Sequence, residues 1–156
     1  MPALSDYVES GFLNHLFRGV PFGIPNNISI ALTSGVPLQS HTGSTIPEVS
    51  RLSMGSSGVP NGYARVHVST SGNRSTQWSY TSANHGNESG VIRNPNQVVF
   101  NTALTDWGPV SGIAVLDNSG YGSGNLLMYA QLENPRQIYT GDSIKFSSNE
   151  LKILLQ

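Results

Sequence analysis

The sequence predicts an all-β fold: an antiparallel, jelly-roll-like β-sandwich with a short N-terminal α-helix. The first observation is that about eight short segments combine apolar alternation with turn signals at fairly regular spacing. Such spacing favours an antiparallel sandwich or barrel over βαβ units. The second is that Gly, Pro, Ser, Asn and Thr make up nearly half of the 156 residues, whereas only 11% are charged. This composition is rich in turn formers and poor in the charged residues of long helices.

The length of the chain suits one domain with a sizeable core. We therefore expect residues 1–156 to form a single domain. Within it, a helix should span 6–18 and the sandwich 27–156, with a long loop at 35–61. The sequence contains no strong internal repeat that would indicate another architecture.

The first segment, 6–18, is the only convincing helix in the sequence. Asp6 followed by Glu9 resembles a capping box, and Gly19 is typical of the residue after a helix. Apolar side chains recur along one helical face, namely Val8, Phe12, Leu13, Leu16 and Phe17. Such a stripe packs on its own domain more often than on a partner. With Tyr7 added, docking on another subunit is the alternative.

After Pro25 the apolar period changes from 3.6 to 2, and residues 28–33 predict a half-buried strand. Further strands are expected at 63–70, 77–81, 97–104, 110–116, 126–130, 143–146 and 151–154. Tight turns or bends are expected at 106–109, 118–124, 134–136 and 140–142, where Gly, Pro, Asn and Asp gather. Residues 82–94 should form a turn-rich connection.

The long polar stretch that follows the first strand is a candidate contact element. It runs from Gly35 to Gly62 and contains several Gly and Pro residues. Compact domains rarely keep loops of more than about 12–15 residues unless the loop has a function.

Composition also excludes several classes of function. The formal net charge of -1 argues against a nucleic-acid binder that depends on phosphate contacts. The longest apolar runs are about five residues, too short to span a membrane, and the N-terminus lacks a secretory signal pattern. The chain has no Cys, so it can form neither a disulfide nor a thiolate metal site.

A search for catalytic and binding patterns is negative. The four His residues lack metal-ligand spacing, the nine carboxylates are scattered, and neither a nucleophile elbow nor a P-loop is present. We therefore expect no catalytic residue, no cofactor and no metal ion, and a protein that is not an enzyme. Trp78 and Tyr80, with Arg74 nearby, form the best patch for stacking on sugars, although cross-strand packing explains such aromatics more often.

Several segments resemble one family over most of the chain. They are 4–18, 27–33, 62–65, 106–117, 124–132 and 139–146. These segments are similar to small virion structural proteins of tailed bacteriophages, whose members are called tail-fibre-like or serve as capsid cement (decoration) proteins. The resemblance is weakest at 35–60 and 82–94. It implies a phage structural protein and brings no catalytic residue.

The resemblance and the composition together lead us to expect a capsid cement protein. It would bind the outer surface of the shell, bridge subunits of the major capsid protein and associate with copies of itself. It would be made in the cytoplasm of the host bacterium and reside in the virion, with no nucleic acid or membrane as partner. One alternative is a tail, neck or fibre-attachment protein of the same virion. Another is a glycan-binding module for host recognition.

The expected contact elements are the N-terminal helix and the long loop. Apolar residues of both are the candidate interface residues, namely Tyr7, Phe12, Leu16, Phe17, Val36, Leu38, Ile46, Val49 and Leu52.

Overall fold

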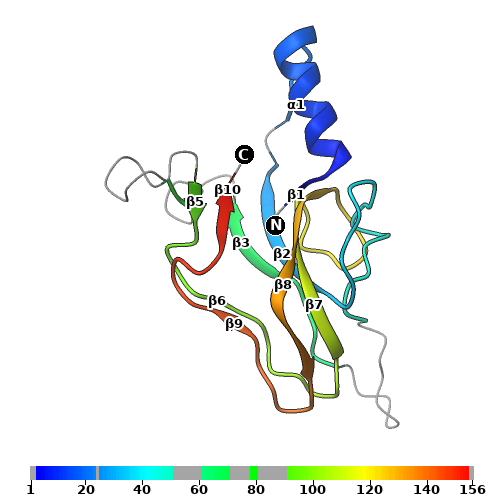
Figure 1. Ribbon diagram of the computed structural model, residues 1–156, viewed down its shortest axis with the longest axis vertical. Coiled ribbons are helices and arrows are strands. Elements are labelled where there is room, and N and C mark those ends of the chain that lie inside the picture. Colours follow the sequence, from blue (N-terminus) through cyan, green and yellow to red (C-terminus); the bar gives the residue numbers. More distant parts are fainter. Residues whose placement is uncertain (1–2, 24, 51–60, 71–77, 81–90, 155–156) are drawn as a thin grey trace.

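The computed structural model describes residues 3–23, 25–50, 61–70, 78–80 and 91–154 (Figure 1). In chain order its elements are β1 (Ala3–Leu4), α1 (Asp6–Arg18), β2 (Asn27–Thr33), β3 (Val66–Thr70), β4 (Ser79–Tyr80), β5 (Val91–Arg93), β6 (Val98–Val99), β7 (Gly108–Leu116), β8 (Leu126–Ile138), β9 (Lys145–Phe146) and β10 (Lys152–Leu154). The predicted all-β sandwich with a short N-terminal helix is confirmed. The finer jelly-roll connectivity stays a prediction.

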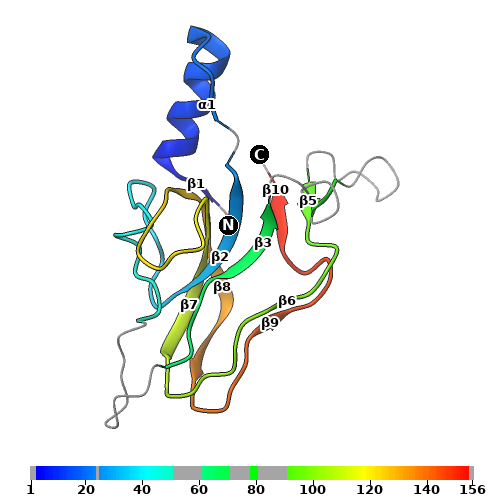
Figure 2. The same ribbon diagram turned by 180° about the vertical axis from the view of Figure 1, so that it is seen from behind.

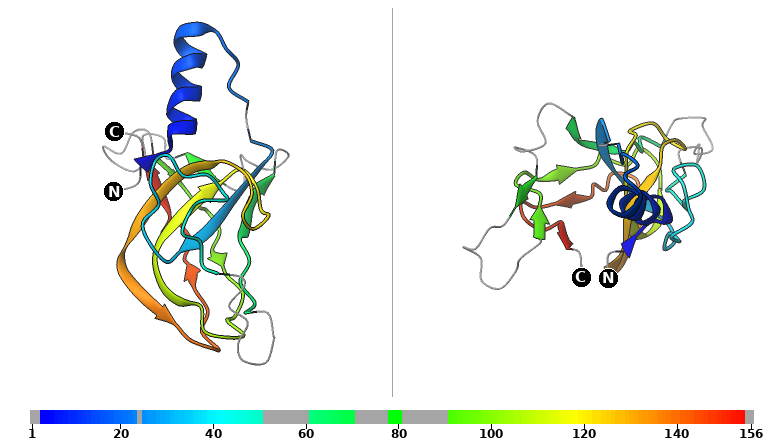
Figure 3. Two further views of the ribbon diagram at one scale, coloured as in Figure 1. Left: turned by 90° about the vertical axis from the view of Figure 1, so that its right-hand side faces the viewer. Right: turned by 90° about the horizontal axis from the view of Figure 1, so that it is seen from above.

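The described strands form two layers. One layer is a five-stranded sheet in the order β1-β8-β7-β2-β3, and the other contains β10-β5-β4 together with the pair β6-β9. Every pairing between these strands is antiparallel. Seen from above, the five-stranded sheet lies on one side and β5, β10, β6 and β9 lie on the other (Figure 3). Helix α1 stands beyond the end of the layers (Figure 2).

The main core lies between these layers and centres on an aromatic group. The ring of Tyr63 stacks on Phe100 at a centroid distance of 6.5 Å and meets the edge of Trp107 at 5.4 Å. Other buried members of this cluster are Ile30, Leu32, Val49, Val98, Val110, Ile138, Phe146 and Leu151.

Strand β2 is buried on both faces, which corrects the prediction of a half-buried strand. Ile30 and Leu32 face the main core, whereas Ala31 packs in a second cluster with Ile46 and Ala114. Residues 35–50 supply Ile46 and pack on that second face of the sheet. Leu116 and Leu126 complete this second cluster, so both faces of the sheet are covered at β2.

Several strand predictions need correction: the strand expected at 63–70 begins at Val66, and the one expected at 143–146 shortens to β9. Strand β8 extends to Ile138 instead of ending near residue 130, and the expected strand 97–104 shortens to β6. Two short strands were missed. Strand β1 has only two residues, and β5 lies within the segment expected to be a connection. Segments this short carry too few residues to show a period of 2.

The loop predicted at 118–124 is confirmed in position, whereas the tight turn predicted at 106–109 is wrong: the chain bends at Leu104 and Thr105, and Gly108 and Pro109 are the first residues of β7. Gly108 adopts φ +82°, a conformation that favours glycine, and joins the buried Trp107 to β7. The loop that follows β7 closes where Asp117 accepts hydrogen bonds from the backbone and side-chain nitrogens of Asn125, at 2.6 and 2.7 Å. This loop connects β7 to β8 as a hairpin.

Candidate interaction surfaces

The N-terminal helix is held to the body of the molecule at its start, where Ser5 bonds to β8 and the Asp6 N–H donates to Gln39 O at 3.0 Å. Ser5 caps the helix: its Oγ accepts from the Val8 N–H at 3.3 Å and donates to the carbonyl of Leu126. The Ser5 N–H donates to Leu127 O at 3.1 Å. The predicted capping-box start at Asp6 and Glu9 is therefore wrong, because the cap is one residue earlier and Val8 occupies the position where a box needs Glu or Gln.

One face of α1 is covered by the segment that follows it. The chain turns at Gly19, with φ +65°, and Phe22 folds back onto Tyr7 at a centroid distance of 5.6 Å. A Cβ on Gly11 would lie 2.3 Å from the Phe22 ring, so only glycine allows this close packing. We call residues 5–23 the helical arm.

The opposite face of α1 is an exposed apolar stripe. The exposed fractions are 54% for Phe12, 56% for Leu13, 57% for Leu16 and 79% for Phe17, and no residue of the helix is buried. The expectation that the stripe would pack on its own domain is wrong. The helix projects away from the body of the molecule instead (Figures 1 and 3).

The remaining interface candidates lie in the long loop and differ in their exposure. Val36 and Leu38 are exposed, at 45% and 59%. Ile46 and Val49 are core residues, at 7% and 0%, so they cannot contact a partner in this conformation. They are buried because the loop packs back onto β2, where Val49 N–H donates to Leu32 O at 3.0 Å. Leu52 lies outside the described residues.

A buried ion pair fixes the loop in place. Arg65 contacts Glu48 through two hydrogen bonds, from Nε to Oε1 at 2.8 Å and from Nη2 to Oε2 at 2.7 Å. Its remaining donors reach the carbonyls of Gly43, Asn118 and Ser123 at 2.8–3.0 Å. One guanidinium thus joins the loop 35–50 to the tip of the β7–β8 hairpin.

Tyr63 completes this arrangement, which we call the Arg65 network. Its hydroxyl donates to Glu48 Oε1 at 2.9 Å and accepts from the Leu32 N–H at 3.0 Å. Burial, and secondly the Glu48 carboxylate, raise the pKa of the Tyr63 phenol far above its ordinary value, so the hydroxyl stays protonated. Sequence reasoning missed this network, because Glu48 and Arg65 lie 17 positions apart with no local pattern between them.

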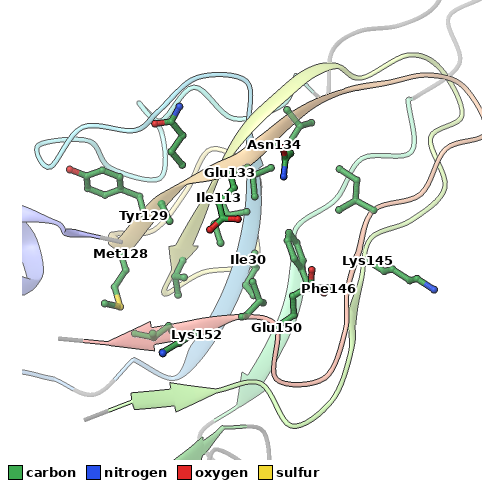
Figure 4. Close-up of a pocket in the computed structure, with 18 of the residues that line it drawn as sticks. Ile30, Ile113, Met128, Tyr129, Glu133, Asn134, Lys145, Phe146, Glu150 and Lys152 are labelled. Carbon is green, nitrogen blue, oxygen red and sulfur yellow. The ribbon is translucent and has the colours of Figure 1, made fainter. Parts of the chain in front are cut away.

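A groove opens between the two layers on the side of β8 (Figure 4). Its volume is about 660 Å³. Its apolar lining consists mostly of buried side chains, since Ile30, Val110, Val115, Phe146 and Leu151 are at most 8% exposed, whereas Ile113 and Ile153 are half-buried. Charged side chains on the rim are Glu133, Arg136, Lys145, Glu150 and Lys152.

Strand β8 is distorted along the rim of the groove. Gly112 pairs with Gln131 while Val110 pairs with Arg136, so one residue of β7 faces four residues of β8. The bulged residues are Leu132, Glu133, Asn134 and Pro135. The bend predicted at Asn134 and Pro135 is thus a bulge within one continuous strand.

A metal site, a membrane-spanning helix and a sugar-binding patch have little support among the described residues. Among the described residues, no three His, Asp or Glu side chains gather as a metal site would require, and no helix is long and apolar enough to cross a membrane. Trp78 lines the groove. The side chain of Tyr80 and the whole of Arg74 lie outside the described part of the chain.

Comparison with known proteins identifies the family. The model of the family described as podophage GP4 fiber I protein gp80 matches residues 3–154. No curated protein matches the sequence. Since the match covers nearly the entire chain, the protein belongs to this family and is a fibre-type structural protein of the phage virion.

Proposed function

We propose that this protein is a non-enzymatic component of the phage tail or fibre-attachment apparatus that binds a neighbouring virion protein through its helical arm. The observation that carries this proposal is the exposed stripe of α1, on a chain whose family description names a fibre protein. The family description supports this location better than the capsid cement function expected from the sequence.

The arm has the properties of a contact element. Its four most exposed apolar side chains present on the order of 500 Å², as large as the largest apolar patch of a typical monomer. Covering such a surface is favourable by roughly 25 cal/mol per Å². Because α1 is fixed to the sheet only near Ser5, a partner can reach the stripe without disturbing the core.

We propose at the same time that the protein has no enzymatic activity. The buried charges that could do chemistry, Arg65 and Glu48, already use their hydrogen-bonding capacity within the protein. Their side chains are at most 3% exposed, so a substrate would have no access to them. Their contacts fit a structural role in holding two loops together.

The decisive experiment is to locate the protein on the intact particle by cryo-electron microscopy. We expect a small number of copies on the tail axis or at the base of the fibres. Hundreds of copies distributed over the icosahedral shell would contradict this location and restore the cement function, with the major capsid protein as partner.

A matched pair of variants tests the role of the arm on the same particles. Phe12→Ser combined with Phe17→Ser should weaken attachment by roughly thirtyfold or more, as for residues at the centre of an interface. Leu104→Ser is the control, because Leu104 is 56% exposed but lies outside the arm. Equal attachment of both variants would show that the stripe is not the contact.

A further inference from the structure

We propose that the packing of Phe22 against α1 keeps this helix folded and its apolar stripe exposed before a partner binds. This inference rests on the proposed function of the helical arm as a contact element, and it says how the arm is prepared for that contact. Residues 19–23, which we call the strap, follow the helix and fold back along it on the way to β2 (Figures 1 and 3). The strap covers the face of α1 that is opposite the stripe.

Helix α1 has little support apart from the strap. It has 13 residues, a length at which isolated helices are marginal in water, and Gly11 in its middle is an unfavourable residue for a helix. No residue of the helix is buried, and it is hydrogen-bonded to the body of the molecule at its start, near Ser5 and Asp6. Helices in proteins are stabilised mainly by packing, so the turns beyond this start depend on another part of the arm.

The strap supplies this packing at both ends of the helix. The Val20 N–H donates to Asn14 O at 3.2 Å and so satisfies a carbonyl group of the last turns. The Phe22 ring lies against the ring of Tyr7, in the first turn, at a centroid distance of 5.6 Å. The Phe22 N–H donates to Nδ1 of His15, in the last turn, at 3.4 Å. One short segment thus connects the two ends of α1.

Gly11 makes room for the Phe22 ring. A Cβ at this position would overlap two carbon atoms of the ring, so any other residue must displace Phe22. Tyr7, Gly11 and His15 follow one another at intervals of four residues, so they share the face of the helix that the strap covers. Phe22 and Gly11 therefore lie outside the stripe and would not touch a partner that binds there.

A helix that is folded before contact binds more tightly than one that must fold during contact. The apparent affinity of a partner is reduced in proportion to the fraction of molecules that have the binding conformation. If loss of the strap lowered the helical fraction to about one tenth, the apparent affinity would fall about tenfold. Phe22 and Gly11 should therefore control attachment, although neither belongs to the contact surface.

The direction of the effect of Gly11→Ala tests this inference in the full-length protein. Alanine normally favours a helix more than glycine does, so without a role for the strap this substitution should slow hydrogen exchange of the α1 amides. We expect the opposite. Gly11→Ala displaces Phe22, so exchange in α1 should become several-fold faster while exchange in β2 and β7 stays unchanged. Ser10→Ala, at the neighbouring exposed position, is the matched control and should not accelerate exchange.

Binding of the purified protein to particles assembled without it gives the second measurement. Phe22→Ala should weaken this attachment by about tenfold, because fewer molecules have a folded helix. A cross-link within α1 should restore it. The chain has no cysteine, so Ser10→Cys and Asn14→Cys, four residues apart, can be bridged by a short thiol-reactive linker. The same cross-link in the protein that retains Phe22 is the control and should leave attachment unchanged. If the linker does not restore attachment of Phe22→Ala, Phe22 acts on the partner directly and the inference is wrong.

The inference and the proposed function fail in different ways. Unchanged or slower exchange of the α1 amides in both Gly11→Ala and Phe22→Ala would overturn the role of the strap, even if the stripe is the contact surface. Normal attachment of the Phe12→Ser, Phe17→Ser variant would overturn the proposed function, and faster exchange in Phe22→Ala would then show that the strap only stabilises the helix.

Discussion

At the scale of single residues, the Arg65 network is the most consequential feature of the fold. A chain with only 11% charged residues buries a complete ion pair, and the cost of desolvating it is offset by hydrogen bonds to every side of the guanidinium. Such a pair adds little net stability compared with apolar residues, but it requires both partners to be present.

Replacing Glu48 should therefore lower the stability of the folded protein. Glu48→Gln leaves the Arg65 charge buried without its counter-ion and should lower the free energy of unfolding by about 3 kcal/mol. Urea denaturation measures this change. Glu133→Gln serves as the control, since Glu133 is exposed and its loss should cost less than about 0.5 kcal/mol. Equal effects of the two substitutions would mean that the buried pair has no special role.

The buried phenol of Tyr63 gives a pH-dependent prediction. Its pKa is raised in the folded protein, so its contribution to stability is complete below about pH 10, the ordinary value for tyrosine, and declines above it as the unfolded chain ionises. In an alkaline absorbance titration, Tyr63 should ionise only when the protein unfolds. Tyr63→Phe should abolish that step, whereas Tyr139→Phe, at an exposed position, should preserve it.

At the scale of elements, the helical arm and the loop 35–50, both expected to contact a partner, differ in how much of their apolar surface is exposed. The apolar stripe of α1 is exposed, whereas the polar, Gly- and Pro-containing loop buries Ile46 and Val49. The reason is the attachment of each element. The loop is bound at both ends to β2 and the hairpin tip, whereas the helix is held near its first residue.

The role of Ser5 in attaching the helical arm to the sheet can be tested by substitution. Ser5→Ala removes both the helix cap and the hydrogen bond to Leu126, and loss of a cap alone costs typically about 1 kcal/mol. Hydrogen exchange of the α1 amides should become several-fold faster while exchange in β2 and β7 stays unchanged. Ser10→Ala, at an exposed site within the helix, is the control, and equal acceleration by both would contradict the assigned role of Ser5.

At the scale of the whole molecule, the low charge and the exposed apolar stripe of α1 favour contacts that do not depend on ion pairs. Attachment to the particle should therefore change little between low salt and roughly 0.5 M salt, because few ion pairs can be screened. Pelleting of particles after salt washes measures the retained protein. Release of most of it at the higher salt would show that the contacts are mainly electrostatic.

The sequence alone determined the fold class, the helix at 6–18 and the position of the hairpin loop after β7. Alternation of apolar residues and the placement of Gly, Pro, Asn and Asp are local properties, and they predicted β2, β7 and the hairpin loop after β7 correctly. The family resemblance rested on such segments and is confirmed over residues 3–154. Whether the protein acts on the tail or the shell was not determined by these patterns, and the fibre description now favours the tail.

Only the tertiary structure decided which apolar residues are available to a partner. Phe12 and Phe17 remain exposed while Ile46 and Val49 are buried, although the sequence predicted all four as interface residues. The difference depends on contacts between residues distant in the chain: the Arg65–Glu48 pair holds the loop against the sheet, and the Ser5–Leu126 hydrogen bond holds the helix at its start. Periodicity reports only neighbours along the chain, whereas burial depends on which distant segments cover a surface.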